Sequence, residues 1–388
     1  MNTTNLHFLN VRRVGLMAGA LLLITLTACR RDQPPPPVTG GLPPSPVLVA
    51  QPVIVVPDDY VYYPDYGVYY TFRFGDPDYM RDYVVNMPPA DQLGGFYMGS
   101  DGYCPGRDFL DREAGPGPRP PVIEKQWYSF MLLGRLSYDP TLSDAHFERV
   151  LGARFPGVAA QDVYRALQAG SQTMPLTTRF FWGDIDIKWF PEGSVQGSGN
   201  KGYLSVLDFA EGVTMPGSNV LNIRQWRASL LAKRPMNGTT PLQIADALTG
   251  AGHEALQAVS ALRAQTPRAN ADELRKTLVD CEALGWLALS YAEKIRAACD
   301  LGLFDLSHDD GEQASAVRHL GVALDAWKHY ATVRDGQYLP ALYGRAGYVN
   351  ITELTSKVAG DIEIARNWKP NSIRAVVPGQ NTEAGFGQ

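Results

Sequence analysis

The sequence predicts a mainly α-helical protein, in which a C-terminal helical domain packs on a short βα unit and a disordered, proline-rich tether precedes both. Three observations lead to this fold class. Apolar residues recur at helical spacing over most of the chain after residue 122. Short Val- and Tyr-rich runs that favour strands stand before that point. Prolines are concentrated in residues 29–57, where they prevent a buried core.

The first 28 residues have the layout of a secretory signal peptide. A basic start at residues 12–13 precedes an uncharged apolar run at residues 14–26, which is too short to span a bilayer. Residues 26–29 (LTAC) resemble the lipobox of bacterial lipoproteins, so we expect cleavage before Cys29 and lipidation of its thiol. The alternative is an ordinary signal peptide with a chance cysteine. Arg30 stands where inner-membrane lipoproteins carry aspartate, which implies a lipid anchor in the outer membrane of the cell envelope.

Composition narrows the classes of function. A net charge of −5 without a basic block argues against nucleic-acid binding. Beyond Cys29, an odd number of cysteines remains (Cys104, Cys281 and Cys299), with no Cys-x-x-Cys motif or His-rich cluster. We therefore expect free, mostly buried thiols, no metal site and no cofactor. Tryptophan and tyrosine side chains in polar company suit stacking against sugar rings.

The segments before residue 122 read as a tether and a strand-containing unit. Residues 29–57 are expected to be disordered, because their proline and glycine runs cannot bury a core. The unit at residues 58–121 contains strand signals at residues 70–74 and 95–98, with a helical stretch at residues 79–86 between them. The order strand, helix, strand is typical of a parallel βα unit.

The helical domain is expected to run from residue 122 to residue 370, and a disordered tail from residue 371 to residue 388. Its pattern predicts three shorter helices and then three long ones that pack as antiparallel neighbours. The shorter helices are expected at residues 124–136, 143–151 and 159–173. The long helices are expected from Pro241 after a Thr240 cap, at residues 270–299 and at residues 311–334. A loop-rich stretch at residues 180–216 separates the two groups.

Several motifs resemble known families. Residues 124–145 resemble the start of the C-terminal helical domain of family 67-type α-glucuronidases, where an aromatic helix runs into Gly-Arg-Leu-x-aromatic-(Asp/Asn)-Pro-x-Leu, as residues 134–142 do here. The stretch from residue 72 to about residue 369 is more closely similar to a group of exported bacterial glucuronidase-like proteins, some of them labelled carbohydrate-binding. The residues that carry this second likeness are 95–99, 179–184 and 214–218.

The resemblance implies where carboxylates would act. In α-glucuronidases a (β/α)₈ barrel precedes the helical domain, a mid-barrel glutamate is the acid, and carboxylates that end the last two strands act as base. The βα unit here would be a short remnant of that barrel. Residues 74–79 align with the seventh-strand motif and residues 96–101 with the eighth, which makes Asp78 and Asp101 candidate bases. An inverting hydrolase needs its base and acid roughly 6.5–9.5 Å apart, and the ends of barrel strands can provide this.

Candidate substrate contacts lie beside these carboxylates and in a second constellation. Asp76 and Tyr97 neighbour the two candidate bases in sequence, and Arg179, Trp182 and Asp184 form the second group. In a sugar subsite, tryptophan would stack on the ring while aspartate and arginine bind hydroxyl groups or a uronate. The alternative is that the aspartates cap helices or turns, that Arg179 pairs with Asp184, and that Trp182 fills the junction between the barrel remnant and the helices.

The resemblance also implies an incomplete catalytic centre. About 40 residues separate Cys29 from the expected seventh strand, whereas six βα units need roughly 150 or more, and no residue stands at the acid's position. We expect a membrane-tethered, glycoside hydrolase-like protein that binds glycan, or acts only with a partner chain that supplies barrel strands. If active, it would be an α-glucuronidase-like glycoside hydrolase. The alternatives are a structural envelope lipoprotein with an exposed apolar helical face, and a truncated gene product with unpaired apolar edges at residues 72–74.

Overall fold

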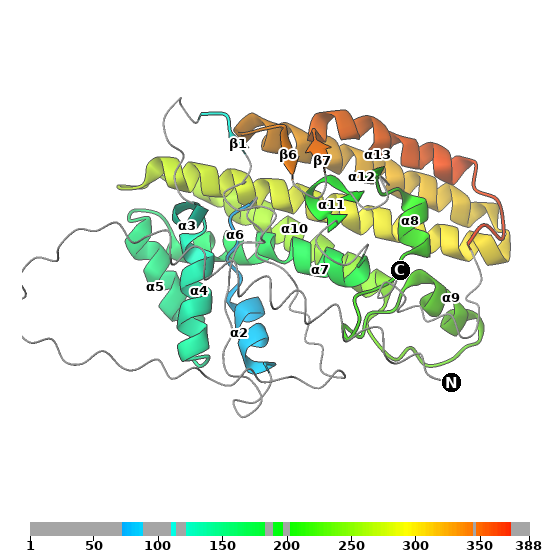
Figure 1. Ribbon diagram of the computed structural model, residues 1–388, viewed down its shortest axis with the longest axis horizontal. Helices are drawn as coiled ribbons and strands as arrows, with labels where there is room; N and C mark the ends of the chain where they lie inside the picture. Colours follow the sequence, from blue (N-terminus) through cyan, green and yellow to red (C-terminus); the bar gives the residue numbers. More distant parts are fainter. Residues whose placement is uncertain are drawn as a thin grey trace, which may run out of the picture. The chain divides into compact units, whose positions relative to one another are not determined.

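The computed structural model describes part of the chain, and the fold is built from that part (Figure 1). The described residues are 72–87, 110–113, 122–182, 189–196, 202–343 and 347–373. The expected signal peptide, lipidated cysteine and tether lie outside these residues, as do the expected strand at residues 95–98 and most of the expected tail. Within the described ranges the fold is mainly α-helical, which confirms the predicted class.

Six helices of the described chain lie before residue 182. They are α2 (Pro77–Val85), α3 (Val122–Lys125), α4 (Trp127–Tyr138), α5 (Asp144–Arg154), α6 (Ala160–Ser171) and α7 (Thr173–Phe180). The helices expected at residues 124–136, 143–151 and 159–173 are thus confirmed, with two breaks. Gln126 interrupts the first, between α3 and α4, and the third divides into α6 and α7 at Gln172.

Short strands and one short helix occupy residues 180–216, where a loop-rich stretch was expected, and a second short helix follows that stretch. They are β2 (Trp189–Phe190), the 3₁₀ turn η1 (Pro191–Gly193), β3 (Val195–Gln196), β4 (Gly202–Tyr203), α8 (Val206–Glu211) and α9 (Ile223–Leu231). The three strands form an antiparallel sheet in the order β2–β3–β4, in which Val195 pairs with both Phe190 and Tyr203. Two antiparallel pairs join β1 (Leu110–Asp111) to β5 (Tyr338–Leu339) and β6 (Ala341–Tyr343) to β7 (Gly347–Val349).

Three long helices dominate the C-terminal half, as the hydrophobic periodicity predicted. They are α10 (Pro241–Arg263), α11 (Ala271–Ser307) and α12 (Asp310–Gln337). Thr240 caps α10, because its side chain accepts a hydrogen bond from Gln243 N (3.2 Å) while Gln243 Oε1 accepts one from Thr240 N (2.8 Å). Both α10 and α12 pack along α11, and α13 (Ile351–Arg366), which the pattern did not predict, covers α12 (Figure 1). No helix among the described residues is long and apolar enough to cross a membrane.

The buried side chains form two apolar clusters. One lies among α7, α8, α9 and α11–α13 and includes Tyr291 and Trp327. The other lies among α2, α4, α5, α6 and adjoining parts of α10 and α11, and includes Phe74. Cys281 belongs to the second cluster and Cys299 to the first, and both are free and buried, as the sequence predicted. Burial raises the pKa of each thiol, which makes both poor nucleophiles near neutral pH.

The extended segment at residues 72–76 differs from the prediction. A strand was expected at residues 70–74, but the described part pairs with no strand of the described chain. The Gln126 side chain takes the place of a neighbouring strand, because its Nε2 donates to Phe72 O (2.6 Å) and its Oε1 accepts from Phe74 N (3.3 Å). Both phenylalanine side chains are buried, so the exposed apolar edge expected of a truncated product is absent from these two residues.

Two more side chains of the described chain bond this segment. Arg73 N donates to Asp280 Oδ2 (3.0 Å) on α11, and Gly75 N donates to Ser171 Oγ (2.7 Å) at the end of α6. A buried backbone group without a partner costs free energy comparable to a lost hydrogen bond. Side chains of the helical domain thus provide hydrogen-bond partners for backbone groups of a segment that the sequence alone placed in a sheet.

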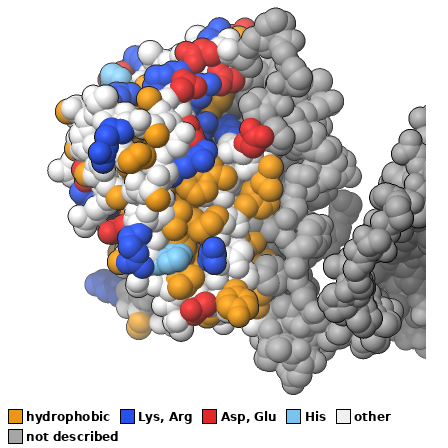
Figure 2. Space-filling model, turned by 90° about the vertical axis from the view of Figure 1, so that its left-hand side faces the viewer, with side chains coloured by type: hydrophobic (Ala, Val, Ile, Leu, Met, Phe, Trp, Pro, Cys, Tyr) orange, Lys and Arg blue, Asp and Glu red, His pale blue; other side chains and the backbone are white. Residues whose placement is uncertain are grey.

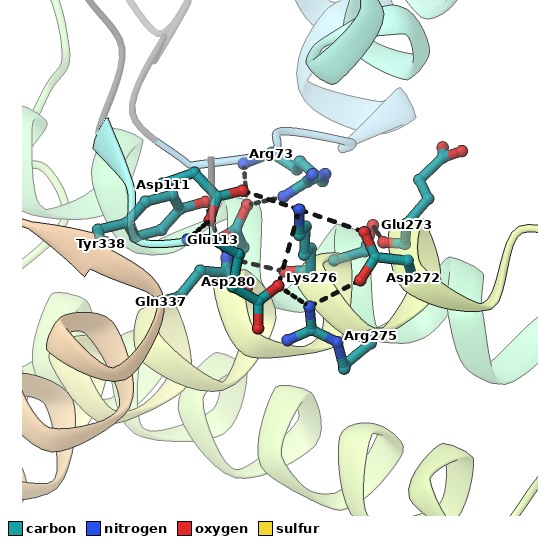
Figure 3. A network of polar contacts seen from close by, with 11 residues as sticks. Arg73, Asp111, Glu113, Asp272, Glu273, Arg275, Lys276, Asp280, Gln337 and Tyr338 are labelled. Carbon is teal, nitrogen blue, oxygen red and sulfur yellow. Dashed lines mark hydrogen bonds and ion pairs between the residues drawn. The ribbon is translucent and has the colours of Figure 1, made fainter. Parts of the chain in front are cut away.

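Asp280 is the centre of the polar network that holds this segment (Figure 3). Its side chain is fully buried, and its Oδ2 also accepts from Arg73 Nη1 (2.7 Å). Its Oδ1 accepts from Gln337 Nε2 (2.8 Å) and from the Tyr338 hydroxyl. At the outer edge of the network, Lys276 Nζ lies 2.8 Å from an Asp111 carboxylate oxygen. One buried charge therefore ties α11 to the extended segment and to the end of α12.

Removing this charge should destabilise the protein strongly. In Asp280→Ala, the Arg73 guanidinium loses its buried partner, and loss of one member of a buried pair typically costs about 3–5 kcal/mol. Asp272→Ala on the same helix is the matched control, because this carboxylate is 65% exposed and should cost at most about 1 kcal/mol. Urea unfolding followed by circular dichroism measures both free energies of unfolding. Equal losses in the two variants would contradict a central role for Asp280.

Candidate functional site

The start of α2 carries two of the predicted site residues, Asp76 and Asp78. Asp76 is the N-cap, and its Oδ1 accepts hydrogen bonds from Asp78 N (3.0 Å) and Tyr79 N (3.2 Å). Pro77 occupies the first helical position, where its fixed φ and missing N–H are tolerated. Asp76 thus has the capping role that the alternative interpretation of the aspartates expected.

The environment of Asp76 favours the protonated carboxyl group. The residue is only 4% exposed, and burial raises its pKa to about 7. The nearby charge of Asp78 raises the pKa further, whereas the two backbone hydrogen bonds lower it. Near neutral pH, the Asp76 carboxyl group is therefore partly protonated, whereas an ordinary exposed aspartate is ionised.

Asp78 faces solvent with its oxygens already bonded. Its side chain is 55% exposed, and Gln168 Nε2 of α6 donates to its Oδ2 (2.8 Å). Arg81 forms an ion pair with its Oδ1, and also donates from Nη2 to Asp144 Oδ1 (3.1 Å) and to Leu142 O (3.1 Å). Exposed ion pairs contribute little free energy of folding. This one nevertheless fixes the orientation of the two carboxylates at the surface.

Two buried tyrosine hydroxyls lie behind these carboxylates. Tyr128 of α4 and Tyr164 of α6 are both more than nine-tenths buried, and the Tyr128 hydroxyl has no hydrogen-bond partner within the described ranges. The Tyr128 ring lies against Gly75, where an added Cβ would come within 2.6 Å of Tyr128 Cδ1. Burial raises the pKa of Tyr164, as do the neighbouring charges of Asp144 and Asp78 and a hydrogen bond to the Asp144 side chain. The Tyr128 hydroxyl keeps a capacity for hydrogen bonding that buried polar groups normally use.

These residues make up what we call the α2 site. It comprises Asp76, Asp78, Arg81, Tyr128, Asp144, Tyr164 and Gln168. The sequence singled out only the first two. Tyr128 and Asp144 lie inside the motif at residues 124–145. That motif served only to predict the fold, although it also contained the signal for these two site residues. Gln168 and Tyr164 stand on an amphipathic helix, and no local signal marks them.

The second predicted constellation lies elsewhere. Arg179 is in the last turn of α7, where its carbonyl accepts from Met215 N (3.0 Å). Trp182 follows α7, is 7% exposed, and donates its backbone N–H to Val213 O (2.9 Å). In the described part of the chain, no hydrogen bond or ion pair joins Trp182 to Asp78. The Trp182 side chain is thus largely buried, and its role as a sugar-stacking surface stays a prediction.

The remaining predicted site residues fall outside the described ranges. They are Cys29, Tyr97, Asp101 and Asp184. Among the residues that are described, no three His, Cys, Asp or Glu side chains come together as metal ligands.

Comparison with known proteins supports the fold class. No protein-family model matches the chain, and no curated protein matches it. The structure is similar to a GH138 enzyme targeting pectin rhamnogalacturonan II, with a TM-score of 0.62 at 15% sequence identity. The similarity covers 76% of this chain and 45% of that chain, so the chain spans less than half the length of the enzyme. The chain therefore has a glycoside hydrolase-like fold, whereas its relation to family 67 stays a prediction.

The raised pKa of Asp76 should make stability depend on pH. Its value in the folded state, about 7, lies above the ordinary 3.8, so its stabilising contribution is complete below pH 3.8 and is lost as the pH rises through 7. Asp76→Asn keeps an oxygen for the helix cap and removes the ionisation. Between pH 5 and pH 8 the natural protein should lose roughly 3 kcal/mol relative to this variant.

Urea unfolding at several pH values measures this difference. Asp325→Asn, which changes a carboxylate that is 73% exposed on α12, is the matched control and should follow the natural protein. Parallel pH profiles for the natural protein and Asp76→Asn would show that Asp76 titrates like an exposed aspartate.

Proposed function

We propose that this protein is a membrane-tethered, carbohydrate-active protein that binds glycan at the α2 site and does not hydrolyse it unaided. The observation that carries the proposal is the pair of half-exposed carboxylates of Asp78 and Asp144, which Arg81 holds side by side at the surface. Hydroxyl groups and carboxylates are hydrogen-bonding partners for sugar hydroxyls. The glycoside hydrolase-like fold and the sequence resemblance at Asp78 give further support.

The contacts of the two aspartates favour binding over catalysis. The raised pKa of Asp76 would suit a general acid, but this carboxyl is buried and bonded to the first turn of α2. Asp78 would have to release Arg81 or Gln168 to act as a base. From the sequence resemblance we further propose that any hydrolysis needs a partner chain that supplies barrel strands. The further sugar contacts proposed from the sequence are Tyr97, Asp101, Arg179, Trp182 and Asp184.

A second candidate function is a structural envelope lipoprotein that binds other proteins. It is favoured by one face of α4, where Met131, Gly134, Arg135 and Tyr138 line a depression of about 510 Å³. Tyr138 is 94% exposed, and an exposed aromatic side chain of this kind is common at contact surfaces. Figure 2 shows hydrophobic side chains gathered on the end of the molecule that carries α4 and α5.

Glycan binding tests the first proposal directly. The full chain in detergent should bind members of a panel of pectic, glucuronylated xylo- and algal oligosaccharides without turnover. Asp78→Ala should weaken binding about fivefold or more, because a hydrogen bond to a charged group is lost. The control is Asp325→Ala on α12, measured by the same calorimetric titration.

The other outcomes have definite meanings. Turnover that disappears in Asp78→Ala would show a working hydrolase and contradict the assignment to binding alone. If no glycan binds to the folded protein, the glycan proposal fails and the α4 face becomes the better candidate.

Lipidation at Cys29 accounts for the proposed tether to the outer membrane. Cells that express the natural chain should incorporate a clickable palmitate analogue into it and retain it in the outer-membrane fraction. Cys29→Ser should lose the label and leave that fraction, while Cys104→Ser should behave like the natural chain. Label retained in Cys29→Ser would reject this lipid site.

A further inference from the structure

A histidine of α12 lies between two carboxylates of α11. His319 Nδ1 is 2.5 Å from Glu293 Oε2, and its Nε2 is 3.7 Å from Asp300 Oδ2. The two carboxylates stand about two helical turns apart on α11, so they belong to the same face of that helix. The side chains of His319, Glu293 and Asp300 are 31%, 19% and 17% exposed, so water screens their charges only in part.

The cluster extends from α11 to α10 through one arginine. Arg296 Nη1 lies 2.8 Å from Glu293 Oε1, and its Nη2 lies 2.7 Å from Asp246 Oδ1 on α10. Arg296 Nη1 also donates to Thr249 Oγ1 (3.0 Å). When the carboxyl groups are ionised, Glu293 and Asp246 together outweigh the one charge of Arg296. The side of α11 that faces His319 is therefore negative, and Asp300 adds to this charge.

The other groups near Asp300 come from α12 itself. Ser315 hydrogen-bonds the Asp300 carboxyl group, the charge of Arg318 favours its ionised form, and the charge of Asp300 in turn acts on Glu312. Helix α13 also packs on α12, but among the described residues no ion pair joins it to His319. The charges that act on the imidazole ring thus come chiefly from α11.

These contacts favour the positively charged ring. The hydrogen bond with Glu293 raises the pKa of His319 above its ordinary 6.5, and the charges of Glu293 and Asp300 raise it further. Burial and the charge of Arg296 act in the opposite direction. Because the pKa is raised in the folded state, the stabilising contribution is complete below pH 6.5 and is lost as the pH rises through the folded-state pKa.

We propose that His319 is a pH-sensitive clamp between α11 and α12, tight in acidic surroundings and weaker above neutral pH. Both ring nitrogens of an imidazolium carry a proton, so the charged ring can attract both carboxylates at once. A neutral ring carries one proton and no charge, and it keeps at most one of these contacts as a hydrogen bond. The clamp does not depend on glycan binding, because its residues lie outside the α2 site.

The clamp acts at the edge of a seam that stays packed in both states. On its inner side α12 buries Ala316, Leu320 and Ala323 in the apolar core. Loss of the charge should therefore loosen α12 locally without unfolding the bundle. The same helix ends at Gln337, whose side chain bonds Asp280, so a firmly seated α12 also supports the network around residues 72–76.

The titration of His319 tests the first step. In the natural full chain, ¹³C-labelled histidine followed by NMR should show a midpoint for His319 above pH 6.5, with the signal assigned by its absence from His319→Gln. Glu293→Gln should lower this midpoint by about 1, because the charged partner is lost. The matched control is Glu282→Gln, which removes a carboxylate of similar exposure that pairs with α10 from the same helix, and it should leave the midpoint unchanged.

Hydrogen exchange tests the clamp itself. Between pH 5 and pH 8, the protection factors of the backbone amides of residues 315–323 should fall roughly fivefold more in the natural chain than in His319→Gln. Asp76 titrates in both proteins, so its effect cancels from this comparison. His253→Gln, which changes an exposed histidine of α10, should behave like the natural chain.

The outcomes that would overturn the clamp are specific. A His319 midpoint at or below pH 6.5 in the natural chain would show that the carboxylates do not hold a proton on the ring, and this measurement needs no variant to fold. An equal fall in protection in the natural chain and His319→Gln would show that the ring titrates without tying the two helices together.

Discussion

The backbone of residues 72–75 must be hydrogen-bonded where it lies, and this requirement organises the part of the fold around it. Phe72 and Phe74 are buried on it, so its N–H and C=O groups have no access to water as an alternative partner. Within the described residues, partners come from three places far apart in sequence, through Gln126 at the start of α4, Ser171 of α6 and Asp280 of α11. Each partner is fixed in turn by its own helix, so the segment sets how α4, α6 and α11 meet.

The site follows from that anchoring. Once Gly75 is bonded to α6 and packed against Tyr128, the next residue, Asp76, has to start α2 beside that tyrosine. The same step brings Asp78 within reach of Gln168. The buried and the exposed charges have different roles. The buried Asp280 network holds the segment in place, whereas the exposed carboxylate of Asp78 remains open to solvent.

Sequence reasoning succeeded where the determining interactions are local. The periodicity of apolar residues and the Thr240 cap predicted α10, because both act within a turn or two of helix. It failed at the expected strand, because the partner of Arg73 is Asp280, 207 residues further along the chain, and no pattern near either residue reports the other. The sequence predicted Asp76 as a candidate substrate contact, and helix capping was the alternative role. The burial of Tyr164 beside Asp144 is a property of tertiary packing, which sequence periodicity does not contain.

The contact between Gly75 and Tyr128 has an evolutionary consequence. An added methyl group at position 75 would overlap the tyrosine ring and would also come within 3.1 Å of Leu167 Cβ, so position 75 cannot enlarge while the ring stays in place. The two should therefore change together among divergent copies of this chain, with a larger residue at position 75 accompanied by a smaller one at position 128. A related protein with a smaller residue at position 128 would also lose the tyrosine hydroxyl. The residues at positions 75 and 128 should therefore indicate whether the site is under selection.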